Sequence, residues 1–573
     1  MTNNETVIKV LSLLLNPGIF LVIASLVSIY FKVLRQKFSF AIFISAALIL
    51  LVAQYNGLLM FHEFNLLGLK LTPLQITDNN FLLAASFLLC LFCQILFFND
   101  IKNLRLINSI SGAICGLGIV AISSSDYLTL IISNELIVIL STLLIFMESS
   151  DKSYNIGFRY ISIHIFSSVL LLMGIAILVN TTGSLSISPI KLSECLSSVS
   201  SGNIQNLGQY LIVLALLVDC ATFPFSNWLV NSYSSTHPYV SITISSYGTK
   251  VILFFLAKIF LGNDLLLYIG LISMLYSGVL SLATGNIRQI ISYNMVNKFG
   301  FILVCIGFGG ASVEKIVIYL IAYYVMSNLI LFLVAGKLNI SSGVSAINEL
   351  LIYDRKSMLF IAVGVISTIA FPLTGGYLAK LDLFQVLTSD KLLYALVTIL
   401  AIPPMAALLK LLLPYIRKED LIRSDKDEWI KTETASLTIS TIFILFSAIF
   451  YNYFVTDDSA TNDHNAIGHT ISYLLSLFTI FGFLYFMRKS LIRHNLEVLD
   501  FDWFVRKPLT FFICKVIEIL SLCQKKILLY IQSYDSYSIP SYTKHIIYSN
   551  WLIGTVISSF IVSLLTLFLL LYL

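Results

Sequence analysis

The sequence predicts an all-α polytopic membrane protein, and composition, charge and the length of the apolar runs all indicate this fold class. Of the 573 residues, 58% are hydrophobic and only 11% are charged, and the mean hydropathy is +0.91. A bilayer span takes roughly 20 apolar residues, and runs of this length recur along the chain. This composition excludes a string of soluble domains, and we expect the lipid bilayer, not a nucleic acid, as the surrounding partner.

About 16 segments satisfy the length rule for a membrane span. The first is expected to be an uncleaved span, because its apolar run has no convincing cleavage site. The spans are placed at 12–31, 39–60, 80–98, 106–124, 127–147, 160–180, 207–229, 239–260, 264–284, 290–310, 314–336, 357–386, 392–414, 434–455, 468–487 and 549–573.

Basic side chains collect in the loops on one side of the predicted membrane. If every span crosses once, the loops rich in Lys and Arg share one side, whereas the Ser/Thr-rich segment 181–206 and the acidic segment 456–469 share the other. Basic loops face the cytoplasm. We therefore expect a multi-pass protein of a bacterial-type inner (plasma) membrane with its N-terminus outside.

Two of the apolar segments are interrupted by proline. Phe223-Pro224 interrupts one of them and Phe371-Pro372 interrupts another. Proline removes a backbone N–H, and at membrane depth the freed carbonyls must face protein or a water-filled cavity. Paired interruptions in two halves of a chain are typical of transporters built from repeats. Two unrelated proline kinks are the alternative.

Several ionisable residues are expected at membrane depth, where such residues indicate an ion pathway. Lys250 follows the interruption at Pro224, and Lys380 follows the one at Pro372; a structural ion pair is the alternative for each lysine. His164 is expected to be a structural histidine of the helix bundle. The candidate ion-translocating residues are Glu135, Asp219, Lys250, Lys298 and Lys380.

Residues 497–546 differ from the rest because lysines interleave with apolar residues spaced three, four or seven apart. This pattern predicts an amphipathic helix over 507–532, lying along the cytoplasmic surface before the final span. An ordinary basic linker is the alternative.

Four motifs occur in a fixed order within about 120–415, and the tail carries a fifth. Together they resemble the antiporter-like membrane subunits of respiratory complex I (NADH-quinone oxidoreductase) and of Mrp-type Na+/H+ antiporters. The tail motif makes the chain most similar to the Mrp D-type group. The motifs are Asp219-Cys-Ala-Thr-Phe-Pro-Phe-Ser-Asn-Trp-Leu, Thr249-Lys250, Asn286-Ile-Arg288 with Lys298-Phe-Gly300, Phe371-Pro-Leu-Thr-Gly-Gly-Tyr-Leu-Ala-Lys380 and Asp500-Phe-Asp502-Trp503.

The resemblance implies two inverted five-helix repeats, each with a broken helix, and half-channels joined by a polar axis. It also implies a subunit that conducts protons or monovalent cations beside other membrane subunits, in a complex-I-like oxidoreductase or a multisubunit Na+/H+ antiporter. The expected segments are N-terminal transmembrane helices at 1–105, the first repeat at 106–260, the second repeat at 261–415, C-terminal transmembrane helices at 416–496, the amphipathic lateral segment at 497–546 and a final transmembrane helix at 547–573.

No Rossmann fingerprint, P-loop, cysteine cluster or haem motif is visible, so we expect no cofactor and no catalysis by this chain alone. The chain also departs from the family pattern. Asp219 stands at the position of the family's seventh-helix lysine, and Tyr324 and Asn328 replace a histidine and a lysine of the eleventh helix. The alternative function is therefore a non-conducting structural or assembly subunit.

Asp219 needs a partner if it lies at membrane depth. We expect an Asp219–Lys250 ion pair across the break at Pro224, because an intramembrane charge usually pairs with protein. A Na+ ion near Asp219 is the alternative, since carboxylates and the carbonyls of an unwound helix are hard oxygen ligands.

Overall fold

A computed structural model describes most of the transmembrane part of the chain. The described residues are 15–57, 64–66, 69–71, 76–99, 103–190, 204–342, 355–412 and 429–455, apart from 32, 311 and 373, together with the single positions 482 and 515. The chain forms two compact units, Met1–Val498 and Leu499–Leu573. Apart from position 515, everything described belongs to the first unit.

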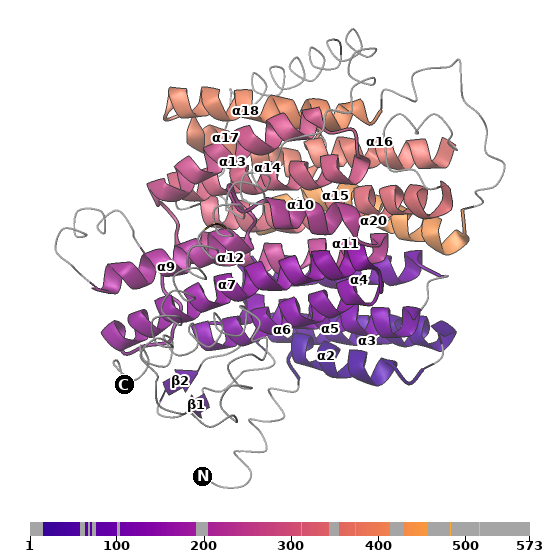
Figure 1. The fold of residues 1–573 in the computed structure, drawn as a ribbon, viewed down its shortest axis with the longest axis horizontal. Helices are drawn as coiled ribbons and strands as arrows, with labels where there is room; N and C mark the ends of the chain where they lie inside the picture. Colours follow the sequence, from indigo (N-terminus) through magenta and orange to yellow (C-terminus); the bar gives the residue numbers. More distant parts are fainter. Residues whose placement is uncertain are drawn as a thin grey trace, which may run out of the picture. The chain divides into compact units, whose positions relative to one another are not determined.

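The described part of the first unit is almost entirely helical (Figure 1), which confirms the predicted all-α class. The one hairpin among these residues pairs β1 (Phe64–Leu66) with β2 (Leu69–Leu71) in antiparallel register. The helices are α2 (Pro17–Ser28), α3 (Val33–Tyr55), α4 (Asp78–Phe97), α5 (Leu104–Ser123), α6 (Tyr127–Phe146), α7 (Asp151–Thr182), α9 (Ile204–Asp219), α10 (Asn227–Ser235), α11 (Pro238–Ser246), α12 (Gly248–Ile259), α13 (Asp264–Ala283), α14 (Ile287–Phe308), α15 (Val313–Ser342), α16 (Arg355–Ile369), α17 (Gly375–Leu387), α18 (Lys391–Lys410) and α20 (Lys431–Phe454).

Within the described ranges, 11 helices are long and apolar enough to cross a membrane. Three shorter apolar helices, Pro17–Ser28, Asn206–Asp219 and Lys356–Ile369, accompany them. Every expected span that falls on described residues coincides with one or two helices. The expected spans 468–487 and 549–573 and the lateral segment 497–546 lie outside the described residues, apart from the single positions 482 and 515.

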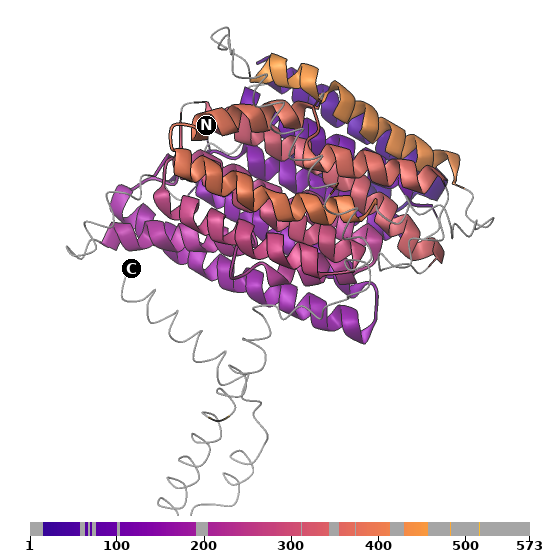
Figure 2. The same cartoon turned by 90° about the horizontal axis from the view of Figure 1, so that it is seen from above.

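Helices α14 and α15 form the centre of the first unit. Their apolar windows are 100% buried, whereas only 28% of the window of α3 and 33% of those of α7, α18 and α20 are buried. A helix that is apolar all round and enclosed by others belongs to the core of a bundle. Figure 2 shows the outermost orange helix, α20, beside the indigo N-terminal helices, and α20 packs on α4 there.

Glycines bring the most extensively packed helix pairs together. A Cβ atom added to Gly270 of α13 would lie 2.6 Å from the carbonyl oxygen of Gly300 of α14, and one added to Gly300 would lie 2.8 Å from that of Gly270. Small residues let membrane helices approach closely and gain dispersion contacts that lipid cannot replace. The same reciprocal contact joins α2 to α5 through Gly18 and Gly116, and α7 to α9 through Gly174 and Gly208.

Both predicted interruptions are real breaks, and both begin with the same backbone pattern. Helix α9 ends at Asp219 and α10 begins at Asn227, with Pro224 between them; α16 ends at Ile369 and α17 begins at Gly375, with Pro372 between them. Each break contains an alanine with a left-handed backbone, at φ 56° in one and φ 64° in the other. In each, the next N–H bonds back five residues to a helix carbonyl, at 3.2 and 3.1 Å, which satisfies one of the groups that a helix end leaves open.

The sequence did not predict a third interruption, between α11 and α12. Tyr247 there has φ −113° and ψ −67°, so the expected span 239–260, which counts as one candidate span over Pro238–Ile259, is divided into α11 and α12. The run Ser245-Ser246-Tyr247-Gly248 contains residues that compete with or loosen the helix, and this signal was available in the sequence.

We expect Gly300→Leu to destabilise the protein, because its side chain would meet the Gly270 carbonyl and force α13 and α14 apart. Overpacking of this kind costs about 1–3 kcal/mol. A lower melting temperature of the purified protein in detergent would reveal it. Gly183→Asn is the matched control, because no atom lies within 4 Å of a Cβ at that left-handed position and asparagine tolerates such a backbone. Equal melting of both variants would contradict the contact.

Candidate functional site

Lys250 is buried on α12, just after the break at Tyr247, and is 1% exposed. Its ammonium donates to the carbonyl of Ser245, on the other side of the break, and to Thr249 Oγ1 at 3.2 Å. The ammonium also lies 5.0 Å from the ring centroid of Phe299, a favourable cation–π position. Lys250 is therefore held by a carbonyl, a hydroxyl and a ring.

Lys380, on α17, has the same kind of partner at the second predicted break. Its ammonium donates to the carbonyl of Ile369 at 3.1 Å. Ile369 is the last residue of α16, and the last four carbonyls of a helix have no partner within it. The lysine therefore satisfies a backbone group that the break exposes.

Lys298, on α14, contacts two residues of α15, Tyr324 and Asn328. Its ammonium donates to Asn328 Oδ1 at 2.9 Å and lies 4.4 Å from the ring centroid of Tyr324. The ammonium is therefore held by a neutral oxygen and a ring face.

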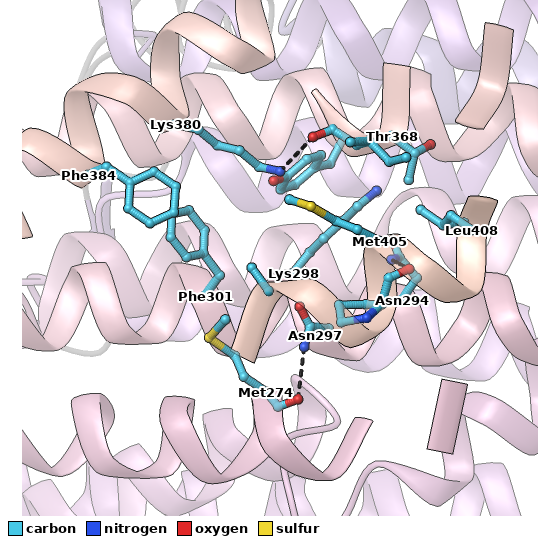
Figure 3. Close-up of a pocket in the computed structure, with 14 residues that line it drawn as sticks. Met274, Asn294, Asn297, Lys298, Phe301, Thr368, Lys380, Phe384, Met405 and Leu408 are labelled. Carbon is cyan, nitrogen blue, oxygen red and sulfur yellow. Dashed lines mark hydrogen bonds between the residues drawn. The ribbon is translucent and has the colours of Figure 1, made fainter. Parts of the chain in front are cut away.

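Lys298 and Lys380 line one cavity of about 40 Å³ between α14, α17 and α18 (Figure 3). A water molecule needs roughly 10–15 Å³ of such space, so the cavity has room for more than one. No Asp or Glu occurs among the described residues that line it. Asn294 Oδ1 and Thr368 Oγ1 are buried there without a hydrogen-bond partner in the described part of the chain, which favours a hydrated interior.

The expected Asp219–Lys250 ion pair is wrong. Asp219 Oδ1 lies 2.9 Å from His164 Nδ1, and Asp219 Oδ2 accepts a bond from Asn134 Nδ2 at 3.4 Å. An ionised carboxylate only accepts hydrogen bonds, so Nδ1 of His164 is the donor. His164, on the neighbouring helix α7, lies within hydrogen-bonding distance of Asp219. Lys250 instead bonds to the carbonyl of Ser245 at its own break.

Glu135 belongs to the same cluster. The hydroxyl of Ser168 donates to Glu135 Oε1, and Ser168 lies one helical turn beyond His164 on α7. Its oxygen is also 2.7 Å from the His164 carbonyl. Glu135 is half-buried on α6. The cluster therefore brings two carboxylates, Glu135 and Asp219, towards one imidazole.

Sequence reasoning missed the role of His164 as the partner of Asp219. The signal was a polar stripe on α7, because Tyr160, His164, Ser167 and Ser168 are spaced four, three and one residues apart and share one face of a helix. All four are buried. In a membrane helix a polar stripe that is turned away from lipid indicates contact with other polar groups.

Comparison with known proteins finds a family match over part of the chain. Residues 124–402 match the family described as "NADH:quinone oxidoreductase/Mrp antiporter, TM". The N-type subunit of the NADH-quinone oxidoreductase of Wolbachia sp. subsp. Brugia malayi is 25% identical over 291 residues, which are 48% of this chain and 61% of that protein. The D-type subunit of the Na+/H+ antiporter of Bacillus subtilis is 25% identical over 281 residues, or 46% and 56%. The chain therefore spans 61% or less of the lengths of these two relatives.

Solved structures show the same fold. A chain of the Mrp complex from Dietzia sp. DQ12-45-1b superposes with a TM-score of 0.63 at 17% identity, over 85% of this chain and 99% of that one. A chain of respiratory complex I from Thermus thermophilus with bound NADH superposes with a TM-score of 0.67 at 14% identity, over 81% and 99%. At these identities the likeness concerns the fold.

The helix bundle with two broken helices and buried charges defines an antiporter-like, multi-pass membrane subunit. Residues 124–402 match the transmembrane family shared by NADH:quinone oxidoreductase and the Mrp antiporter, and the relatives named above come from both kinds of complex. This confirms the family predicted from the motifs between about 120 and 415. The inverted relation of the two repeats and their boundaries stay predictions.

We expect Asn328→Leu to destabilise the protein by about 2 kcal/mol, because it removes the acceptor of a buried ammonium. In a Lys298→Met background the same substitution should cost much less, since no charge is then left unpaired. Thermal unfolding of the four proteins of this double-mutant cycle measures the coupling. Additive losses would contradict the contact between Lys298 and Asn328.

Proposed function

We propose that this chain is an ion-conducting membrane subunit of a larger complex, either a complex-I-like NADH:quinone oxidoreductase or a multisubunit Na+/H+ antiporter. It moves protons or monovalent cations and acts beside other membrane subunits. The observation that carries the proposal is that Lys250, which is buried, and Lys380, which is partly buried, each donate to a carbonyl at a helix break.

The chemistry of these contacts supports ion movement. A charge at membrane depth is costly and is retained where it serves a pathway. Within the described ranges, neither Lys250, Lys298 nor Lys380 forms an ion pair with a carboxylate. Their partners are neutral oxygens and rings. Release of a proton from any of the three therefore breaks no ion pair.

The three lysines also follow one another across the centre of the bundle. Lys250 on α12 packs against Phe299, the residue next to Lys298 on α14. Lys298 shares its cavity with Lys380 on α17, and it lies within electrostatic range of both other lysines. We propose that protons pass along this row, in a bacterial-type inner membrane with the N-terminus outside.

One observation favours the second candidate function, a non-conducting structural subunit. Asp219 stands where the family has a lysine, is paired with His164, and borders a cavity of only about 10 Å³. In a scaffold, the first half of the pathway would be closed and the lysine row would serve packing alone.

We expect Lys250→Met and Lys380→Met each to lower ion movement at least tenfold in vesicles that contain the complete native complex. Methionine keeps the length and apolar stem of lysine but cannot carry a proton, so assembly should persist. Transport is followed with a proton-sensitive dye and a Na+-sensitive dye in parallel.

Lys410→Met is the matched control. Lys410 is also a buried lysine at a helix end, with its ammonium 3.4 Å from the carbonyls of Leu282 and Thr284, but it lies outside the row. Its variant should transport within twofold of the wild type. Full transport by the Lys250 and Lys380 variants would favour the scaffold.

A further inference from the structure

A second, smaller cavity lies beside the His164–Asp219 pair. Its volume is about 10 Å³, and helices α6, α7, α9, α10 and α12 contribute to its lining, which includes His164, Asp219 and Thr249. This volume is close to the minimum that holds one water molecule. The cavity therefore has space for a single water, and its lining includes polar side chains.

His164 presents two different nitrogen atoms. Nδ1 is bonded to Asp219, while Nε2 is buried and has no hydrogen-bond partner among the described residues. The ring centroid lies 4.4 Å from that of Tyr160 and 4.6 Å from that of Trp228. The imidazole is thus fixed in orientation by Asp219 and two rings, and its free nitrogen needs a partner that the small cavity can supply.

Thr249 connects this cavity to Lys250. It lines the same space as His164, and its hydroxyl oxygen lies 3.2 Å from the ammonium nitrogen of Lys250. A single water between His164 Nε2 and the Thr249 hydroxyl would therefore complete a path from the first cluster to the first lysine of the row.

We propose that His164, poised by Asp219, is the proton carrier of the first half of this chain, in place of the lysine that the family has at position 219. It exchanges its proton with Lys250 through one water and the hydroxyl of Thr249. This inference rests on the proposed function, and it names the ion as the proton.

The transfer conserves every atom. Protonated His164 gives the hydrogen on Nε2 to the water, and the water gives one of its own hydrogens to the Thr249 oxygen. The hydrogen already on that oxygen moves to the lone pair of the neutral Lys250 amine. The imidazole ends neutral, the water and the hydroxyl are restored, and Lys250 ends as an ammonium.

The contacts of the carboxylates favour a proton over Na+ at this place. Na+ is bound by oxygen atoms that point lone pairs at it. Each Asp219 oxygen instead faces an N–H donor, from His164 or Asn134, and Glu135 Oε1 accepts the hydroxyl of Ser168. A Na+ ion would have to share these oxygens with the donors, whereas a proton uses the donors themselves.

Several titratable groups lie around His164. Asp219 from α9 bonds to His164 Nδ1, and Glu135 from α6 bonds to Ser168, one turn further along α7. Tyr160 on the same helix and Tyr233 from α10 lie beside the cavity. Under the proposal, loss of the imidazole should change the pH profile of transport.

His164→Gln tests the proposal in vesicles with the complete complex, in Na+-free potassium buffer from pH 6 to 9. Glutamine can still bond to Asp219 but cannot carry a proton. We expect at least a tenfold loss of proton transport and a changed pH profile. Ser167→Ala is the matched control, because it removes a 2.8 Å bond between α7 and the Ala215 carbonyl without touching the cluster; it should stay within twofold of the wild type.

Thr249→Val supplies an independent variant if His164→Gln fails to assemble. It leaves the His164–Asp219 pair intact, interrupts the path between the cavity and Lys250, and should cause a similar loss. Wild-type rates and an unchanged pH profile in an assembled His164→Gln or Thr249→Val complex would overturn the inference. If Lys250→Met still abolishes transport in that case, the proposed function survives; if the wild-type complex moves no ion, the proposed function itself fails.

Discussion

The described part of this protein depends on one rule of the bilayer, which is that every backbone polar group must find a partner inside the protein. An unbroken helix satisfies its own backbone groups, so each interruption leaves backbone groups that need other partners. Lys250 and Lys380 meet that need at two of the interruptions by donating to a carbonyl. The carbonyl gains a donor and the ammonium gains an acceptor. This mutual bond offsets part of the cost of placing both the charge and the break inside the bundle.

Close helix packing then carries these groups to the centre. The Gly270–Gly300 contact sets α14 against α13, two residues from Lys298, and α14 is enclosed along its whole apolar window. Because the enclosing helices exclude lipid, the polar side chains of α14 face a cavity and the neighbouring α15. The glycine contact therefore decides the surroundings of a charged residue that it does not touch.

Much of the fold could be predicted from the sequence, because apolar length and proline positions are local properties: the described spans and the breaks at Pro224 and Pro372 lie where expected. The partners of the charges could not. Asp219 and Lys250 are close in sequence, and proximity along the chain favoured their pairing. In the fold, His164 from helix α7 bonds to Asp219. The carbonyl of Ser245, on the far side of a break at Tyr247 that the sequence did not predict, accepts a hydrogen bond from Lys250. Which groups become the partners of a charge depends on how each helix is rotated about its axis, and that rotation cannot be read from a single sequence.

The shared cavity of Lys298 and Lys380 has a consequence for stoichiometry. Two ammonium groups in one poorly polarisable space repel each other strongly, and no carboxylate among the described lining residues offsets them. The doubly charged state is thus the most costly of the four protonation states. Under the proposed function, protons would therefore pass through this cavity one at a time, because the charge repulsion requires one to leave before the next arrives.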